Sequence, residues 1–208
     1  MNFLVLVSGS GTNLQALIDA QKAGRFRTNK NTNSGSRIAA VVSDRAGAYA
    51  LERAEKAGIP AFTEIPDKRL SGDKRREELS DRILGIAREY RAGLIILAGF
   101  LSILRGNILV EYEGSIINLH PALLPKYGGA GMYGLKVHDA VLAAGEKESG
   151  CTVHLVDAGT DTGQILLQRK VSVAECDTAE SLAGRIHREE HIAIVEATVL
   201  MLDKLRNR

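Results

Sequence analysis

Short apolar runs alternate with amphipathic segments along most of the chain. The runs are typical of strands buried on both faces and lie at residues 3–7, 38–42, 61–62, 94–97 and 115–119. Between them, apolar residues recur at helical spacing, which predicts helices over residues 14–21, 48–57 and 74–91. Strands that alternate with helices predict a doubly wound, mostly parallel sheet with helices on both faces.

The C-terminal part departs from this alternation. Residues 151–156 alternate like a strand, with Thr152 and His154 on one face, and residues 165–173 return as another strand. Such a hairpin makes the sheet mixed. A long terminal helix begins at Thr178, with Asp177 as the candidate N-cap. Because no boundary interrupts the pattern, residues 1–208 are expected to form a single α/β domain.

The ends of the strands are the expected place for a ligand, because doubly wound sheets bind ligands beyond the carboxyl ends of their strands. A glycine-rich turn at residues 8–13 follows the first strand, and a loop at Gly99 follows the fourth. Asn118 and His120 end the fifth. The next segment, residues 121–134, is too glycine-rich for regular structure, and a loop of this length is usually functional.

Asn118 and His120 lie two residues apart on a predicted strand. Their side chains therefore point to the same face, about 7 Å apart along the chain. Either group costs about 1–3 kcal/mol when it is buried without a partner. Together they suit the polarisation of a carbonyl, with the amide donating a hydrogen bond and the imidazole supplying charge or a proton. The alternative is a histidine that is simply hydrogen-bonded at a strand end.

The turn at residues 8–13 joins a strand to the N-terminus of a helix. Free backbone N–H groups and the helix dipole converge there, which favours a phosphate or another anion. The alternative is a plain tight turn. A dinucleotide site is disfavoured, because Gly9 and Gly11 are not followed by a third glycine or by a well-placed acidic residue.

Composition and charge narrow the function further. The 27 basic and 25 acidic residues leave a formal net charge of +2, which gives no support for a nucleic-acid or membrane surface. The start does not resemble a signal peptide, and no stretch reaches transmembrane length. The two cysteines are expected to stay reduced. A soluble cytoplasmic protein is therefore expected.

The five histidines raise the question of a metal site. His187 and His191 lie four apart on one helix face, as zinc ligands can. The glutamate that directly follows the first histidine of a metalloprotease helix is missing, and no third ligand is apparent. No metal is therefore expected.

Three segments occur together: Ser-Gly-Ser-Gly-Thr-Asn-Leu-Gln at residues 8–15, Asn-Leu-His-Pro-Ala-Leu-Leu-Pro at 118–125, and Asp-Ala-Gly-Thr-Asp-Thr-Gly at 157–163. With them the chain resembles, over essentially its whole length, the phosphoribosylglycinamide formyltransferases, folate-dependent enzymes of purine synthesis. The Asn-x-His-Pro segment with a later Asp-x-Gly is specific to the wider formyltransferase family. Within that family, the first segment and the short length favour the phosphoribosylglycinamide formyltransferases. The resemblance implies a Rossmann-like formyltransferase fold.

The resemblance also implies a reaction. The amino group of glycinamide ribonucleotide would attack the formyl carbon of the co-substrate 10-formyltetrahydrofolate, and tetrahydrofolate would leave. Asn118 and His120 would hydrogen-bond the developing oxyanion, while Asp161 would raise the pKa of the histidine and help to move a proton. By the same resemblance the substrate is bound by Gly11, Thr12, Asn13 and Glu190. The folate is bound by Arg76, Leu101, Ser102, Ile103, Leu104, Asn118 and Asp157.

The chain departs from the family pattern at several positions. Ser102 stands where an arginine is common in bacterial members, Gln164 replaces a usual proline, and His187 takes a place often held by glutamine. The glycine-rich loop at residues 128–133 differs from the commoner forms. None of these positions belongs to the implied catalytic residues.

Related chemistries are the nearest alternatives: hydrolysis of 10-formyltetrahydrofolate, or formyl transfer to another amine such as that of initiator methionyl-tRNA. Both siblings usually carry an additional domain, and the near-neutral charge argues against tRNA. A nucleotide-binding module without catalysis would use only the glycine turn and leave Asn118, His120 and Asp161 without a role. Small-molecule substrates and a monomer or homodimer are therefore expected.

Overall fold

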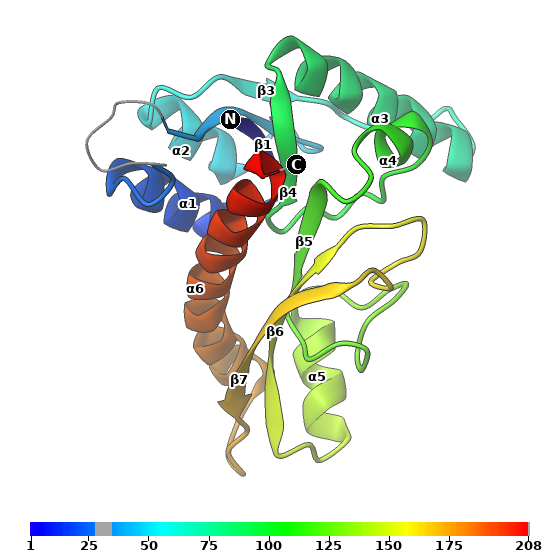
Figure 1. The fold of residues 1–208 in the computed structure, drawn as a ribbon. Coiled ribbons are helices and arrows are strands. Elements are labelled where there is room, and N and C mark those ends of the chain that lie inside the picture. Colours follow the sequence, from blue (N-terminus) through cyan, green and yellow to red (C-terminus); the bar gives the residue numbers. More distant parts are fainter. Residues whose placement is uncertain (28–34, 208) are drawn as a thin grey trace.

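A seven-stranded mixed sheet lies at the centre of the computed structural model, which describes residues 1–27 and 35–207 (Figure 1). The strand order is β3-β2-β1-β4-β5-β6-β7. Strands β1 to β5 pair in parallel, whereas β6 pairs antiparallel with both β5 and β7. The strands are β1 Asn2–Val7, β2 Arg37–Ser43, β3 Ala61–Thr63, β4 Ala92–Leu97, β5 Ile116–His120, β6 Glu148–Leu155 and β7 Ile165–Ser172.

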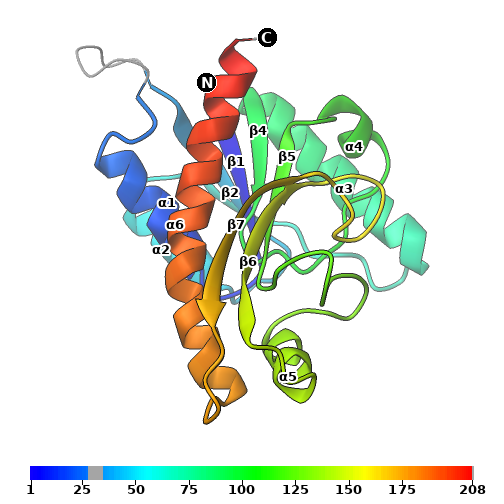
Figure 2. The same cartoon turned by 60° about the horizontal axis from the view of Figure 1, so that its bottom comes forward.

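Helices cover both faces of this sheet (Figures 1 and 2). Alternation along β1 explains the two layers. Phe3 and Val5 are buried with residues of α1 and α6, whereas Leu4 and Leu6 are buried with residues of α3 and α4 on the other face. The predicted doubly wound α/β fold with a mixed edge is therefore confirmed. The helices are α1 Thr12–Lys22, α2 Tyr49–Lys56, α3 Gly72–Glu89, α4 Asn107–Glu111, α5 Leu135–Ala143 and α6 Ala179–Arg206.

The start of α6 differs from the prediction. Thr178, not Asp177, is the N-cap: its hydroxyl accepts a hydrogen bond from the Ser181 N–H at 3.2 Å, and the Ser181 hydroxyl accepts one from the Thr178 N–H at 3.0 Å. Asp177 instead forms an ion pair with Arg185 and accepts a hydrogen bond from the Ala174 N–H. The two adjacent polar residues both suit a cap, and Arg185, nearly two turns into the helix, decides between them by pairing with Asp177.

The carboxyl ends of β1 and β4 meet between the two halves of the sheet, because β4 lies beside β1 rather than beside β3. Such a reversal of strand order leaves a crevice at this edge. The loop at residues 121–134 and the N-terminal half of α6 line the crevice together with these strand ends. Within the described parts of the chain, no helix combines the length and the apolar character that crossing a membrane requires.

Candidate active site

Asn118, His120 and Asp161 come together at one point of the crevice. The Asn118 Nδ2 atom lies 3.4 Å from Asp161 Oδ1, and the His120 Nδ1 atom lies 3.5 Å from Asp161 Oδ2. Asn118 and His120 share a face of β5, and Asp161 reaches them from the turn between β6 and β7. The structure thus brings Asp161 to two side chains that lie more than forty positions before it in the sequence.

Asp161 is held in place by the neighbouring glycine-rich loop. Its Oδ2 atom accepts a hydrogen bond from the Gly129 N–H at 2.9 Å, and its backbone adopts a left-handed φ of 59°. A non-glycine residue in that region is uncommon and is often found at functional sites. At Gly128 a Cβ atom would lie 3.2 Å from Asp161 Cβ and 2.5 Å from the Leu124 side chain. The glycine at this position therefore lets the loop approach the carboxylate.

His154 is a fourth member of this group, and the sequence analysis did not identify it as functional. It lies opposite Asn118 in the antiparallel pairing of β5 with β6. Its Nδ1 atom donates to the Leu155 carbonyl at 2.8 Å, so Nε2 accepts the Asn118 amide N–H at 3.1 Å. Nε2 also lies 3.5 Å from Asp161 Oδ1. The alternation of side chains along residues 151–156 placed His154 on one face of a strand. Only the pairing register of β5 with β6 shows that its neighbour there is Asn118.

The surroundings of His120 set its protonation. Nε2 donates to the Tyr127 carbonyl at 2.8 Å, and Nδ1 faces Asp161. Burial lowers the pKa of His120 and outweighs Asp161 and the Tyr127 carbonyl, which raise it. As expected, Asp161 raises the pKa of His120. The resulting pKa is nevertheless below the ordinary histidine value, because the imidazole is only 4% exposed. His120 is thus neutral at pH 7 in the free protein.

Asp161 remains ionised in the same surroundings. Burial raises its pKa, but contact with His154, the hydrogen bond from the Gly129 N–H and the nearby histidine charges more than offset this effect. The resulting pKa lies below the usual aspartate value. A neutral imidazole, a carboxylate and an amide therefore face one another, and this arrangement can exchange a proton and donate hydrogen bonds to a carbonyl oxygen.

A cavity of about 580 Å³, called here the large cavity, extends from His120 to the N-terminus of α1. Gly11, Thr12 and Asn13 line it at that end. Gly11 has a φ of 71°, and a Cβ atom there would lie 2.6 Å from Ala50 Cβ, so only glycine fits. The first turn of α1 contains no acidic residue, and no side chain of the described residues caps it. The predicted anion-binding geometry is present here.

Glu190 lies on α6 and lines the same large cavity. It is 4% exposed, accepts a hydrogen bond from Asn13 Nδ2 at 3.2 Å, and lies 3.7 Å from His187 Nε2. Burial raises its pKa, against the opposing effects of His187 and Asn13. His187 Nε2 is therefore within ion-pair distance of Glu190. Over residues 1–27 and 35–207, no cluster of three or more potential metal ligands is found.

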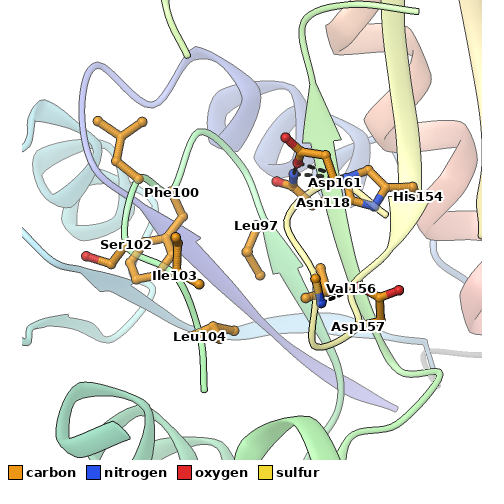
Figure 3. A pocket seen from close by; sticks show the side chains of 12 residues that line it. Leu97, Phe100, Ser102, Ile103, Leu104, Asn118, His154, Val156, Asp157 and Asp161 are labelled. Atoms are coloured by element: carbon orange, nitrogen blue, oxygen red, sulfur yellow. Dashed lines mark hydrogen bonds and ion pairs between the residues drawn. The ribbon is translucent and has the colours of Figure 1, made fainter. Parts of the chain in front are cut away.

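A smaller pocket of about 100 Å³ opens from the other side of the same centre (Figure 3). Figure 3 shows Asn118, His154 and Asp161 grouped at one end of this side pocket and Ser102 at the far end. Asn118 and Asp161 line both spaces, so the reactive group lies where they join. Of the residues predicted to bind the folate, Arg76 lines the large cavity. The others line the side pocket: Leu101, Ser102, Ile103, Leu104, Asn118 and Asp157. Of these, Leu101, Ile103 and Asn118 also line the large cavity.

Asp157 and Ser102 both form hydrogen bonds within the protein. The Asp157 carboxylate accepts from the Gly159 N–H at 2.9 Å and from the Thr162 hydroxyl at 2.7 Å, which shapes the turn that carries Asp161. The Ser102 hydroxyl donates to Asp44 Oδ2 at 2.7 Å. Asp157 thus holds the turn that carries Asp161, and the Ser102 hydroxyl is bonded away from the Asn118 end of the side pocket.

Residues 1–198 match the model of a family described as formyl transferase. The chain belongs to this family. It is 37% identical over 191 residues to phosphoribosylglycinamide formyltransferase of Escherichia coli. The aligned region is 92% of this chain and 82% of that protein. The crystal structure of glycinamide ribonucleotide transformylase 1 from Symbiobacterium toebii aligns with a TM-score of 0.84 at 40% identity, over 98% of this chain and 88% of that one. The resemblance drawn from the three sequence segments is confirmed.

Other members of the formyl transferase family are much longer. The trifunctional purine biosynthetic protein adenosine-3 of Chironomus tentans is 43% identical over 199 residues, yet the match spans 95% of this chain and only 13% of that protein. A formyltetrahydrofolate deformylase from Pseudomonas syringae shares the fold with a TM-score of 0.84 at 21% identity. The same fold therefore occurs in transferases and in a deformylase, so the activity has to be inferred from the residues of the site and not from the fold.

Proposed function

We propose that this chain transfers the formyl group of 10-formyltetrahydrofolate to the amino group of 5-phosphoribosylglycinamide, in the synthesis of purines. The observation that supports this most directly is the junction of the two spaces at Asn118 and Asp161, with His120 beside it in the wall of the large cavity. The large cavity offers an anion site at one end, which suits a ribonucleotide phosphate. The side pocket combines six apolar side chains with a few polar groups, which suits the pterin of a folate. The formyl group and the amine would meet at the junction.

The reaction requires one proton to leave the amine and one to reach the departing folate nitrogen. The amine attacks the formyl carbon, and the carbonyl electron pair moves to oxygen. The Asn118 amide and a protonated His120 donate hydrogen bonds to that oxyanion. Asp161 accepts the amine proton, directly or through a water, and passes it to His120 Nδ1, 3.5 Å from Asp161 Oδ2, so that the neutral imidazole becomes protonated and the carboxylate is restored. The intermediate then collapses, the bond from carbon to the folate nitrogen breaks, and His120 supplies the proton to that nitrogen.

The low pKa of His120 in the free protein fits this cycle. A negative charge that develops within about 4–6 Å raises the proton affinity of an imidazole. The oxyanion and Asp161 then favour the imidazolium together, at the stage when it is needed. His154 would keep the Asn118 amide oriented, because its Nε2 accepts one of the two amide N–H groups and leaves the other for the substrate.

The ribonucleotide would bind along the large cavity. Its phosphate would accept hydrogen bonds from the backbone N–H groups of Gly11, Thr12 and Asn13 at the start of α1. Glu190 lies on the same wall, 3.2 Å from Asn13 Nδ2, where ribose hydroxyl groups would face it. The folate would lie in the side pocket against residues 101–104, with Arg76 nearby in the adjoining space. Both substrates are small molecules.

The decisive experiment follows the release of tetrahydrofolate by absorbance, with and without the ribonucleotide. Release that depends on the ribonucleotide supports the transferase, and His120→Ala should lower its kcat by about 10²–10⁴-fold. Arg88→Ala, a change in an exposed ion pair with Glu111 away from the cleft, should leave kcat unchanged. Release without the ribonucleotide would identify a hydrolase, and tight ribonucleotide binding without any release would indicate a binding module.

A further inference from the structure

The backbone carbonyl of Tyr127 determines which nitrogen of His120 carries a proton. Because a carbonyl oxygen only accepts hydrogen bonds, its contact with His120 Nε2 at 2.8 Å requires the proton on that nitrogen. In the neutral imidazole Nδ1 then carries the lone pair, and Nδ1 is the atom that lies 3.5 Å from Asp161 Oδ2. This tautomer can receive a proton from Asp161, whereas a neutral imidazole with its proton on Nδ1 cannot.

The other tautomer of His120 has a partner of its own. With its proton on Nδ1 the imidazole would donate to the Asp161 carboxylate, and hydrogen bonds to a charged group are about twice as strong as neutral ones. The Tyr127 carbonyl prevents this arrangement, because its oxygen and Nε2 would then face each other with lone pairs. The position of one peptide group therefore controls the proton acceptor of the site.

Tyr127 does not hold this position through a relaxed backbone. Its φ is 57°, in the left-handed region that non-glycine residues seldom adopt, so the surrounding structure has to supply the restraint. The Tyr127 hydroxyl donates to Glu146 Oε1 at 3.0 Å, and Lys126 Nζ donates to the same oxygen at 2.7 Å. Glu146 lies just after α5, so these contacts fix one end of residues 122–127.

Gln168, on β7, fixes the other end of this segment. Its Nε2 atom donates to the Leu124 carbonyl at 2.9 Å and to Thr152 Oγ1 at 3.0 Å. Thr152 lies opposite Gln168 in the antiparallel pairing of β6 with β7. The Thr152 hydroxyl accepts the Leu124 N–H at 3.1 Å and donates to the Ala122 carbonyl at 2.6 Å. The hydroxyl thus uses its one donor and both of its acceptor positions.

The two side chains of this anchor differ in exposure. Thr152 is buried, so a substitution there would disturb folding and function together. Gln168 is exposed, and among the described residues neither it nor Thr152 lines the large cavity or the side pocket. A change at Gln168 therefore removes the hydrogen bonds to the segment without opening a cavity in the core or touching a substrate.

We propose that Gln168 is a positioning residue of the reaction. By holding residues 122–124 against β6, it keeps the Tyr127 carbonyl on Nε2 of His120. Nδ1 is then left free to receive the proton from Asp161. This inference rests on the proposed function, in which Asp161 passes the amine proton to His120.

The first test observes the tautomer of His120 directly in the free protein, by nitrogen-15 magnetic resonance of the histidine rings at about pH 8, where this imidazole is neutral. The His120 signals are identified by their loss in His120→Gln. The wild-type ring should carry its proton on Nε2. In Gln168→Glu the carboxylate has the size of the amide but cannot donate to the Leu124 carbonyl, so the proton should move partly or wholly to Nδ1.

The kinetic constants should change in parallel. In Gln168→Glu, kcat should fall about tenfold or more, because small displacements at a reacting centre cost up to about 100-fold. The KM for the ribonucleotide should change less than about twofold, since no substrate contact is removed. Tyr127→Phe keeps the ring but loses the hydroxyl bond to Glu146, and it tests the same tautomer change from the other end of the segment.

Lys170→Ala is the matched control. Lys170 lies two residues beyond Gln168 on the same face of β7, is exposed and pairs with Glu148, so its removal should leave the tautomer and kcat unchanged. If Gln168→Glu keeps the proton of His120 on Nε2, the proposal is overturned whether or not kcat falls, because a merely structural role would give that result. An unchanged kcat with a changed tautomer would overturn it too. If the wild type transfers no formyl group, the proposed function fails, and the tautomer in Gln168→Glu still decides whether this residue positions His120.

Discussion

The two ends of the large cavity each hold a carboxylate, partly buried at Asp161 and buried at Glu190, and the two have opposite properties. Asp161, at the end where β5 terminates, contacts two histidines and a backbone N–H, and its pKa is lowered. Glu190, at the end where α1 begins, has one amide partner and a more distant histidine, and burial raises its pKa. The surroundings thus favour the ionised form of the carboxyl group at Asp161 and the protonated form at Glu190.

This difference separates chemistry from binding. A carboxylate that stays ionised beside an imidazole can accept a proton during the reaction. A carboxyl group whose pKa is raised keeps its proton to a higher pH, and in the protonated form it can both donate and accept hydrogen bonds, which suits hydroxyl groups of a substrate. Paired acids whose surroundings move their pKa values apart commonly have different roles. Substitutions at each end should therefore affect different kinetic constants.

The largest effect is expected at the charged end. Asp161→Asn keeps an oxygen that accepts the Gly129 N–H but removes the base, so kcat should fall by about 10²–10⁴-fold while the KM for the ribonucleotide changes little. Steady-state kinetics measure both constants, and near-ultraviolet circular dichroism checks the fold. A loss of kcat below about tenfold would mean that Asp161 does not take the proton.

A smaller loss is expected at His154. His154→Ala removes the acceptor of the Asn118 amide, so the amide can rotate and kcat should fall by up to about 100-fold. His154→Gln offers a side-chain oxygen in a similar place and should recover part of the loss. If the two variants have equal kcat values, the orientation of Asn118 does not depend on this contact.

The phosphate end is tested by Gly11→Ala. The added methyl would meet Ala50 at 2.6 Å with φ at 71°, so stability should fall by about 1–3 kcal/mol and the KM for the ribonucleotide should rise. Gly9→Ala is the control for stability, because a Cβ atom there meets nothing within 4 Å. Thermal unfolding and initial rates measure the two effects. Equal melting temperatures for both variants would contradict the strained geometry of Gly11.

The smallest effect is expected for Glu190→Gln, and its sign depends on pH. Because the folded-state pKa of Glu190 is raised, its contribution to stability is present below the unfolded-state pKa and is lost as pH rises through the folded value. The glutamine variant should therefore gain in melting temperature relative to wild type as pH rises above the ordinary glutamate pKa of 4.5, while its KM for the ribonucleotide increases. A Tm difference that does not change with pH would show that burial of the charge is not the cause.

Much of the fold could be predicted because its signals are local. The apolar runs correspond to β1, β2, β4 and β5, and the alternation at residues 151–156 falls within β6. Helix boundaries were less accurate, as α3 begins at Gly72 rather than at residue 74, and the five-residue helix α4 was not predicted. Helix ends depend on capping and on tertiary contacts, and a single turn of helix has almost no periodic pattern.

The sequence by itself determined the side chains that a strand presents to one face, such as Asn118 with His120, and the glycine turn that opens α1. Both follow from backbone geometry over a few residues. Only the tertiary structure decided that His154 lies opposite Asn118, that burial outweighs Asp161 in setting the pKa of His120, and that Ser102 bonds to Asp44. Strand register, desolvation and contacts between distant segments depend on the packing of the whole chain, which no short stretch contains.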